Sequence, residues 1–384
     1  MPASETLLRV APLLERFGIT RIARHTGLDH IGIPVWCAYA PNARSAVIAQ
    51  GKGLSDEDAK VSAVMEALER AVASRPALSS FHATARQLQK EGQQVTTLQS
   101  LIGLRKADIG LDDMIEWTTA LELISGTPIH LPLEAAVLDR RHEGRFWVSS
   151  DGLASGNSFD EAVLHGTLER IERDAFVLWQ ISDISHRHAT CVDPIAFGDE
   201  VLNELVRKVQ AAGLVLKVFD IGSDIAVPCF TALLGPKMVL SSAEVRFTEV
   251  TGGSGAHPSA VRAIIRAVTE AVQSRLTFIS GARDDISPQM FQAALPDQLR
   301  RNFLAVPART PVRAPVIARS LQQCLHFTLN ALRDAGITTV AALALGEPDL
   351  PFSVVKVFIP ELENPDGKRA RRFGSRALSK VFLS

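Results

Sequence analysis

Apolar residues recur at helical spacing in two segments that follow glycine-rich stretches, and each segment carries a pair of glutamates three residues apart. Glu66 and Glu69 form the first pair, and Glu169 and Glu172 form the second. Residues three apart share one face of a helix. The pattern therefore predicts two helices that each display two carboxylates on one side.

The two segments align with each other over their whole length. The matched pairs are Gly53 with Gly156, Ser55 with Ser158, Ala59 with Ala162, Glu66 with Glu169, Glu69 with Glu172 and Arg70 with Arg173. A weaker third copy carries Glu270, Gln273 and Arg275. A single Glu-x-x-Glu-Arg is more often an exposed helix face with local ion pairs. Its recurrence in a matching frame favours a shared site.

The rest of the chain alternates between helical and strand patterns. Residues 4–17 predict a helix, residues 245–250 a strand, and residues 251–257 a glycine loop before the third helix. A helix, an Ala-Gly stop, a strand and a proline-led strand occur twice, over residues 201–234 and 321–359. We expect a mixed α/β fold, with layered sheets, helices packed on them and internally repeated subdomains. Residues 1–384 would form one catalytic unit, with possible subdomains 1–76, 77–182 and 183–384.

Composition and charge narrow the class of protein. The 384 residues carry 41 Lys and Arg against 42 Asp and Glu, a net charge of -1 that provides no global field for nucleic acid or an anionic membrane. The chain lacks the apolar run of a signal peptide or membrane span. Four separated cysteines with no C-x-x-C pair argue against disulfides and structural zinc. We expect a cytoplasmic protein with no nucleic-acid or membrane partner.

The repeated carboxylates point to metal-assisted nucleotide chemistry. Mg²⁺ prefers oxygen ligands and is usually held by one or two carboxylates together with substrate phosphates. Glycine loops at helix starts can bind anions through their N–H groups, and Lys52, Arg173 and Arg275 can bind phosphate. Converging in one cavity, these residues would hold ATP and Mg²⁺.

Other motifs are weaker. The chain has neither the spacing of a P-loop nor a G-x-G-x-x-G after a strand. Gly252-Gly-Ser-Gly-Ala resembles the nucleophile elbow of a hydrolase, with Ser254 as nucleophile, but Ala256 stands where glycine is usual. His165 and His257 are expected to be structural or to lie at the edge of a substrate site.

The three motifs resemble the ATP-binding motifs of the YcaO superfamily. They read Ser62-x-x-x-Glu66-x-x-Glu69-Arg70, then Asn157 with Glu169-x-x-Glu172-Arg173, then Glu270-x-x-Gln273-x-Arg275. The resemblance implies a YcaO-type fold and an ATP- and Mg²⁺-dependent enzyme that phosphorylates the oxygen of a peptide amide attacked by a nucleophile. A Cys, Ser or Thr side chain would give an azoline, sulfide a thioamide, and an amine an amidine.

The resemblance also implies a set of site residues and identifies no catalytic residue. The nucleotide site would comprise Ser62, Glu66, Glu69, Asn157, Glu169, Glu172, Arg173, Glu270, Gln273 and Arg275. The five glutamates Glu66, Glu69, Glu169, Glu172 and Glu270 would bind Mg²⁺.

Two departures from the azoline-forming members favour thioamidation. The chain ends without a proline-rich tail and has no fused E1-like leader-binding domain. We therefore expect a peptide or protein substrate, a separate partner such as a TfuA-type protein, and possibly a homodimer. The alternatives are azoline formation, a non-catalytic leader-binding or scaffolding partner and, more remotely, a serine hydrolase that uses Ser254.

Overall fold

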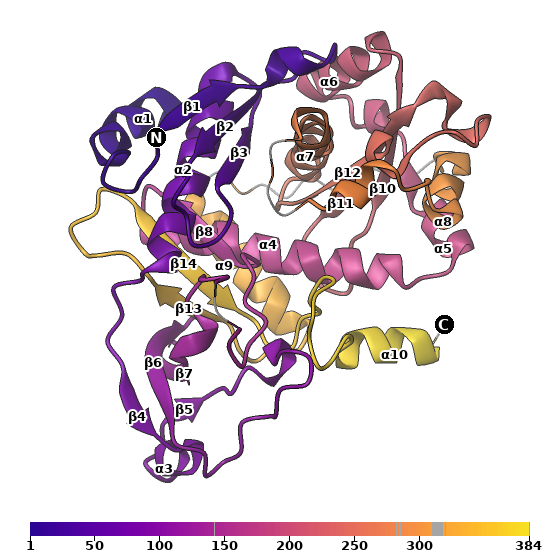
Figure 1. Ribbon diagram of the computed structural model, residues 1–384. Helices are drawn as coiled ribbons and strands as arrows, with labels where there is room; N and C mark the ends of the chain where they lie inside the picture. The colour runs from indigo at the N-terminus through magenta and orange to yellow at the C-terminus, as the bar shows by residue number, and fades with distance from the viewer. Residues whose placement is uncertain (142, 282, 284–285, 309–317, 319, 384) are drawn as a thin grey trace.

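Helices and three antiparallel or mixed sheets build the molecule (Figure 1). The computed structural model describes the whole chain except residues 142, 282, 284–285, 309–317, 319 and 384. The helices are α1 (Ala3–Val10), α2 (Asp56–Ser74), α3 (Ala85–Lys90), α4 (Phe159–Gln180), α5 (Ile184–Ala189), α6 (Glu200–Ala211), α7 (Ala260–Ser280), α8 (Asp297–Arg301), α9 (Leu321–Asp334) and α10 (Ser375–Leu383). The mixed α/β class agrees with the prediction.

The strands fall into sheets of three, four and seven. β1 (Arg21–Arg24), β2 (Val35–Tyr39) and β3 (Ile48–Lys52) form an antiparallel meander. The second sheet has the order β12 (Thr251–Ala256), β11 (Cys229–Pro236), β10 (Leu214–Asp220) and β9 (Cys191–Val192). The third has the order β5 (Gln94–Val95), β7 (Pro128–Pro132), β6 (Ile115–Glu122), β13 (Ala341–Ala344), β14 (Ser353–Phe358) and β8 (Leu153–Gly156), with β4 (Phe81–Ala83) paired to β6.

The predicted duplication in the second half of the chain is confirmed, but its two copies lie in different sheets. α6 leads into the antiparallel pair β10 and β11, and α9 leads into the antiparallel pair β13 and β14. α4 lies between the copies, in contact with β8, β14 and α9 and also with β11 and β12. It is the central element that joins the two sheets.

The three helices with the repeated motif begin in the same way. Ser55, Ser158 and Ser259 cap α2, α4 and α7, each accepting a hydrogen bond from the backbone N–H three residues later. A serine cap satisfies one of the free N–H groups in the first turn. The matched sequences therefore correspond to matched units of strand, serine cap and long helix.

Each unit has a glycine within its strand, although Gly53 in the first unit follows the end of β3. Gly51 belongs to β3, Gly156 to β8, and Gly255 to β12. The prediction of a strand at 245–250 and a loop at 251–257 was wrong, because residues 251–256 are the strand itself. A Cβ atom on Gly51 would lie 2.1 Å from the carbonyl oxygen of Ala59, and one on Gly255 would lie 2.2 Å from that of Ala263. The glycines allow each helix to pack directly on its own strand.

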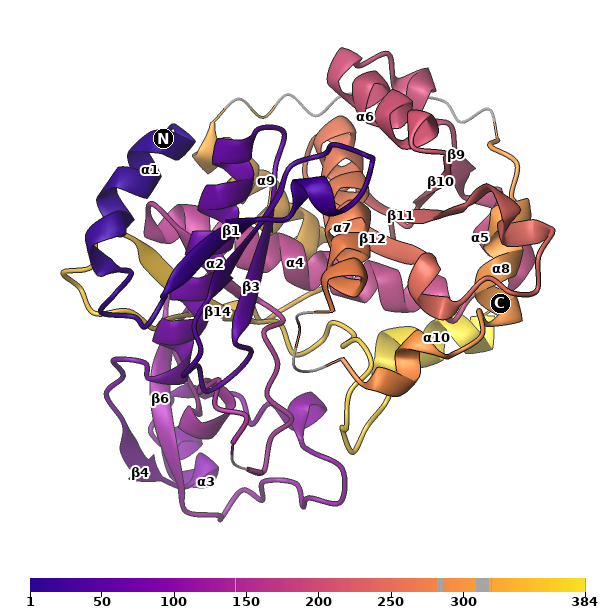
Figure 2. The same cartoon turned by 45° about the horizontal axis from the view of Figure 1, so that its top comes forward.

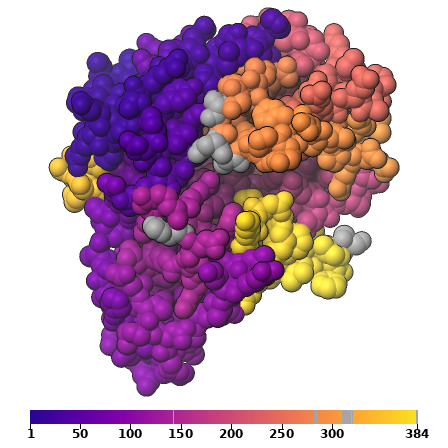
Figure 3. Space-filling model, viewed as in Figure 1, coloured from indigo at the N-terminus to yellow at the C-terminus, as the bar shows by residue number. Residues whose placement is uncertain are grey.

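The N-terminal helix is shorter than predicted. α1 ends at Val10 and continues as a 3₁₀ turn, because Pro12 has no N–H to donate and disfavours helical geometry in the residue before it. Residues 77–115, which have no clear periodicity, supply β4, α3 and β5 to the edge of the seven-stranded sheet. This part of the chain, in purple, projects from the body of the molecule in Figure 3. None of the helices in the described residues has the length and apolar character of a membrane span.

Candidate functional site

A cavity of about 750 Å³ is lined by residues of α2, α4 and α7, three helices that Figures 1 and 2 place near one another. Pockets of roughly 300–1,000 Å³ commonly hold small ligands. Nine of the ten residues predicted for nucleotide binding line it, namely Ser62, Glu66, Glu69, Asn157, Glu169, Glu172, Arg173, Glu270 and Gln273. The motif residues of three helices therefore converge, as the repeat predicts.

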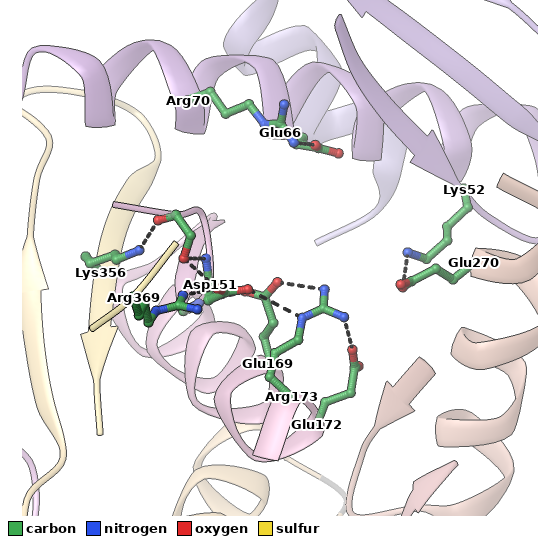
Figure 4. A network of polar contacts seen from close by, with 12 residues as sticks. Lys52, Glu66, Arg70, Asp151, Glu169, Glu172, Arg173, Glu270, Lys356 and Arg369 are labelled. Carbon is green, nitrogen blue, oxygen red and sulfur yellow. Dashed lines mark hydrogen bonds and ion pairs between the residues drawn. The ribbon is translucent and has the colours of Figure 1, made fainter. Parts of the chain in front are cut away.

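Arg173 is the centre of the polar network on α4 (Figure 4). Its Nη2 lies 3.2 Å from Oε1 of Glu169, and its Nη1 lies 3.2 Å from Oε1 of Glu172. Its Nε lies 3.7 Å from Oδ1 of Asp151. Although burial opposes its charge, Glu172 and Glu169 raise the pKa of the guanidinium above its ordinary value. Arg173 therefore stays cationic between these carboxylates.

The other two helices also hold one carboxylate against a cation. On α2, Nη2 of Arg70 lies 2.5 Å from Oε1 of Glu66. On α7, Oε2 of Glu270 accepts a hydrogen bond of 2.9 Å from Nζ of Lys52, which β3 supplies. Burial opposes ionisation of Glu270, but Lys52 and Arg173 together lower its pKa. Figure 4 shows these pairs facing one another across the cavity.

Three carboxyl groups that line the cavity, those of Glu69, Glu172 and Glu169, have a raised pKa. Burial, together with the charges of Glu66 and Glu169, raises the pKa of Glu69 well above its ordinary value, and Ser155 Oγ donates to Glu69 Oε2 at 3.1 Å. Burial also raises the pKa of Glu172, which is 3% exposed, to about 7. Burial therefore favours the protonated form of these carboxyl groups, and a bound cation would favour the ionised form.

A layer behind α4 supports Glu169 and was not found in the sequence. Glu169 Oε2 accepts from the N–H of Gly152 at 2.9 Å, and burial raises the pKa of this carboxyl group. Lys356, on β14, donates to the carbonyl oxygen of Ser149 at 2.5 Å, and burial lowers its pKa to about 8. Arg369 Nη2 lies 3.6 Å from Oδ2 of Asp151. One sign of this layer is present in the sequence, which is a single lysine, Lys356, within the apolar stretch of β14.

The amide residues of the motifs occupy different positions in the cavity. Gln273 Nε2 donates to the carbonyl oxygen of Gln50 at 2.9 Å, and its Oε1 is buried without a hydrogen-bond partner in the described part of the chain. Asn157 Oδ1 accepts from Thr6 Oγ1 at 2.9 Å. Gln273 therefore attaches α7 to β3, while Asn157 ties α1 to the start of α4.

Arg275 is the predicted residue that does not line the cavity. Its Nε lies 3.5 Å from Oδ2 of Asp29, which follows the turn Thr26–Leu28. The contact attaches α7 to the segment that joins β1 to β2. Arg266, which the sequence analysis missed, does line the cavity, and its Nε is buried without an acceptor among the described residues. It precedes Glu270 by one helical turn, which was the available signal.

The histidines and Ser254 do not form a hydrolytic site. His257 Nδ1 accepts from the N–H of Ser259 at 2.8 Å, and burial lowers its pKa to about 4. His165 lines the cavity, and burial lowers its pKa. Ser254 is 5% exposed in β12 and donates to Thr231 Oγ1 at 3.3 Å. The nucleophile elbow was therefore a wrong interpretation, because Ser254 lies within a strand and not on a sharp turn before the helix.

The cavity fits Mg²⁺ bound together with a polyphosphate better than a metal ion bound by protein alone. Among the described residues, no three His, Cys, Asp or Glu side chains converge closely enough to hold one ion. Mg²⁺ beside a nucleotide uses one or two carboxylates, water and phosphate oxygens. The spread carboxylates could bind the metal ion, and the guanidinium of Arg173 could bind phosphate oxygens.

Comparison with known proteins identifies the family to which the chain belongs. Residues 50–363 match the YcaO family, described as YcaO cyclodehydratase, ATP- and Mg²⁺-binding. An uncharacterized protein in the tfuA 3′ region of Rhizobium leguminosarum bv. trifolii is 34% identical over 385 residues, covering 98% of this chain and 91% of its own length.

Two solved structures have the same fold. The YcaO protein of Methanopyrus kandleri, bound with AMPPCP and Mg²⁺, aligns with a TM-score of 0.73 and 22% identity over 94% of this chain and 91% of its own. A heterocyclase in complex with substrate and cofactor aligns with a TM-score of 0.76 and 21% identity, over 95% of this chain but only 52% of that chain. This chain therefore spans about half the length of that heterocyclase.

Proposed function

Because this chain belongs to the YcaO family of ATP- and Mg²⁺-dependent peptide-modifying enzymes, we propose that it activates a backbone amide of a peptide or protein and converts it to a thioamide. The observation that carries the proposal is the convergence on one cavity of eight motif residues from α2, α4 and α7, together with Asn157 just before α4. That cavity receives residues from all three predicted subdomains, which supports one catalytic unit over residues 1–384.

The residues divide by the ligand that each would hold. Glu66, Glu69, Glu169, Glu172 and Glu270 would bind Mg²⁺, which with ATP supplies a transferable phosphoryl group and neutralises phosphate charge. Arg173, Ser62, Asn157 and Gln273 would donate to or accept from the nucleotide. Arg275 would act at a distance, by fixing α7 against Asp29.

Thioamidation is favoured over azoline formation by the relative from Rhizobium leguminosarum. That protein is encoded in a tfuA 3′ region and covers nearly the whole of this chain. A TfuA-type protein is accordingly the proposed partner, and sulfide derived from it or from another donor is the proposed nucleophile. The competing function is a non-catalytic protein that binds a leader peptide or supports an active subunit.

Nucleotide binding is the first test, by calorimetry with AMPPCP in the presence and absence of Mg²⁺. Glu66→Gln and Glu169→Gln should each weaken Mg²⁺-dependent binding by about tenfold or more, because each removes a charge from the proposed metal ligands. Glu57→Gln is the matched control, since Glu57 is exposed on α2 and lies outside the cavity. Unchanged affinity in both cavity variants would remove the proposed site.

Mass spectrometry of the host proteome is the second test. Deletion of the gene should abolish a peptide in which one backbone oxygen is replaced by sulfur, and the wild-type gene should restore it, whereas the Glu169→Gln variant should not. A peptide that has instead lost water would indicate an azoline or amidine. Peptide binding with no ATP turnover in the presence of substrate and partner would favour the scaffolding function.

A further inference from the structure

A second cavity of about 430 Å³ lies against the opposite face of α2, between α2, the β1–β3 sheet and residues 345–350. We call it the arginine cavity. Its described lining contains the arginines Arg16, Arg44, Arg70 and Arg75 and small apolar residues of which the alanines are Ala38, Ala40, Ala43, Ala46, Ala49, Ala67, Ala71 and Ala77. Arg70 lines both this cavity and the cavity between α2, α4 and α7.

The described lining of the arginine cavity contains four guanidinium groups and one carboxylate. Glu347 is the only acidic residue in its described lining, and its Oε2 pairs with Nη2 of Arg16 at 2.7 Å. Arg75 has no side-chain hydrogen bond or ion pair to the part of the chain that the structure describes. From outside the lining, Glu66 pairs with Arg70, and Asp139 is shared by Arg44 and Arg141. Arg75 is thus left without a carboxylate among the described residues, so positive charge remains at the cavity.

Arg44 and Arg70 are only partly satisfied by the protein. Nη1 of Arg44 lies 3.4 Å from Oδ2 of Asp139, but Arg141 holds the same oxygen more closely, at 2.6 Å. The Nε groups of Arg44 and Arg70 are both buried without an acceptor among the described residues. A buried N–H without an acceptor is unfavourable, so these groups call for an acceptor from outside the chain.

The C-terminal turn of α2 disfavours the binding of an anion, because its carbonyl groups form the negative end of the helix dipole. Those carbonyls already have donors: Ala71 O accepts from Ser74 Oγ, Val72 O from the N–H of Arg75, and Ala73 O from the N–H of Leu138. Hydrogen bonds from guanidinium groups to an oxyanion are charge-assisted and strong. The excess of guanidinium groups therefore favours a negatively charged ligand.

We propose that the arginine cavity binds an oxyanion, a carboxylate or a phosphate, through Arg44, Arg70 and Arg75, at a site separate from the nucleotide cavity. The alanine walls leave room beside the guanidinium groups for the apolar body of a ligand that carries the anion. Because Arg70 also pairs with Glu66, an oxyanion that takes donors from Arg70 changes the charge around Glu66 in the neighbouring cavity.

The test is ³¹P line broadening of inorganic phosphate by the purified protein, with and without saturating AMPPCP and Mg²⁺. Phosphate should bind in both conditions, and Arg44→Gln/Arg75→Gln should weaken it by about tenfold or more, since two charge-assisted donors are lost. The control Arg86→Gln/Arg207→Gln loses the same charge from exposed ion pairs elsewhere and should bind phosphate as the wild type does. Should AMPPCP fail to bind, the proposed function fails, while the phosphate measurement without nucleotide still tests the arginine cavity.

A second variant tests the space rather than the charge. Ala71→Leu places a larger side chain in the wall of the cavity and should abolish phosphate binding with AMPPCP affinity kept. A peptide with a free C-terminal carboxylate that displaces phosphate, when its amidated form does not, would identify a peptide carboxylate as the ligand, and no displacement would identify free phosphate. Equal broadening by wild type, the double variant and Ala71→Leu, or complete competition by AMPPCP, would overturn the proposal.

Discussion

Replacing Arg173 by methionine should destabilise the protein, and the cost should depend on pH. The guanidinium lies 3.2 Å from both Glu169 and Glu172, and Glu172 is 3% exposed. Methionine keeps most of the apolar stem and removes the charge. Taking one partner from a buried ion pair typically costs about 3–5 kcal/mol, because it leaves an uncompensated buried charge.

The direction of the pH dependence follows from the pKa of Glu172. Burial raises this pKa to about 7 with Arg173 present, and loss of the cation would raise it further. A carboxyl group with a raised pKa in the folded state stabilises the fold fully below its unfolded pKa, and this contribution is lost as pH rises through the folded pKa. The variant should therefore lose about 1.4 kcal/mol more than wild type for each pH unit above 7, until its own higher pKa is reached.

Urea unfolding followed by circular dichroism at pH 6 and pH 8 measures this difference. Adding Glu172→Gln to Arg173→Met should remove most of the pH dependence, because the titrating group is gone. Arg207→Met is the control, since Arg207 pairs with Glu204 on an exposed face and should cost about 0.5 kcal/mol or less. Equal destabilisation by Arg173→Met at the two pH values would refute the reasoning.

Two further predictions concern the packing that positions the site. Gly51→Ala should destabilise the fold by about 3 kcal/mol or more in urea unfolding, because the new Cβ would lie 2.1 Å from the carbonyl oxygen of Ala59, whereas Gly27→Ala, with open space around it, should have little effect. Arg376→Met should cost about 3–5 kcal/mol by the same measurement, since it leaves the fully buried carboxylate of Asp174 unpaired; a loss under 1 kcal/mol would contradict this.

The recurrence of one pattern was enough to predict which helices meet. Spacing of three residues places Glu66 with Glu69, and Glu169 with Glu172, on one helix face, whatever the tertiary structure. Agreement among three copies then indicated that these faces share a site. The same rule explains the failure at Arg275, because two residues beyond Gln273 rotate the side chain by about 200° around the helix. A motif position two residues from the site faces elsewhere.

Sequence patterns could not find the cations that come from other elements. Lys356 reaches the layer behind Glu169 only because β14 pairs with β8. Arg369 reaches Asp151 through the loop that follows β14. These contacts depend on strand pairing between distant parts of the chain. Local periodicity in the sequence does not predict which strands pair. The prediction of a glycine loop at residues 251–257 was wrong for a related reason. The sequence alone does not distinguish a glycine in a tightly packed strand from one in a loop.

The paired charges of the cavity reduce the repulsion among its carboxylates. Lys52, Arg70 and Arg173 each hold at least one carboxylate, so the acidic residues do not repel one another freely in the folded chain. The same cations are suitable donors for phosphate oxygens. A polyphosphate that takes donors from these cations leaves carboxylates unpaired, and a divalent cation is what those carboxylates then require. We therefore expect nucleotide and metal ion to favour each other's binding through the same ion pairs.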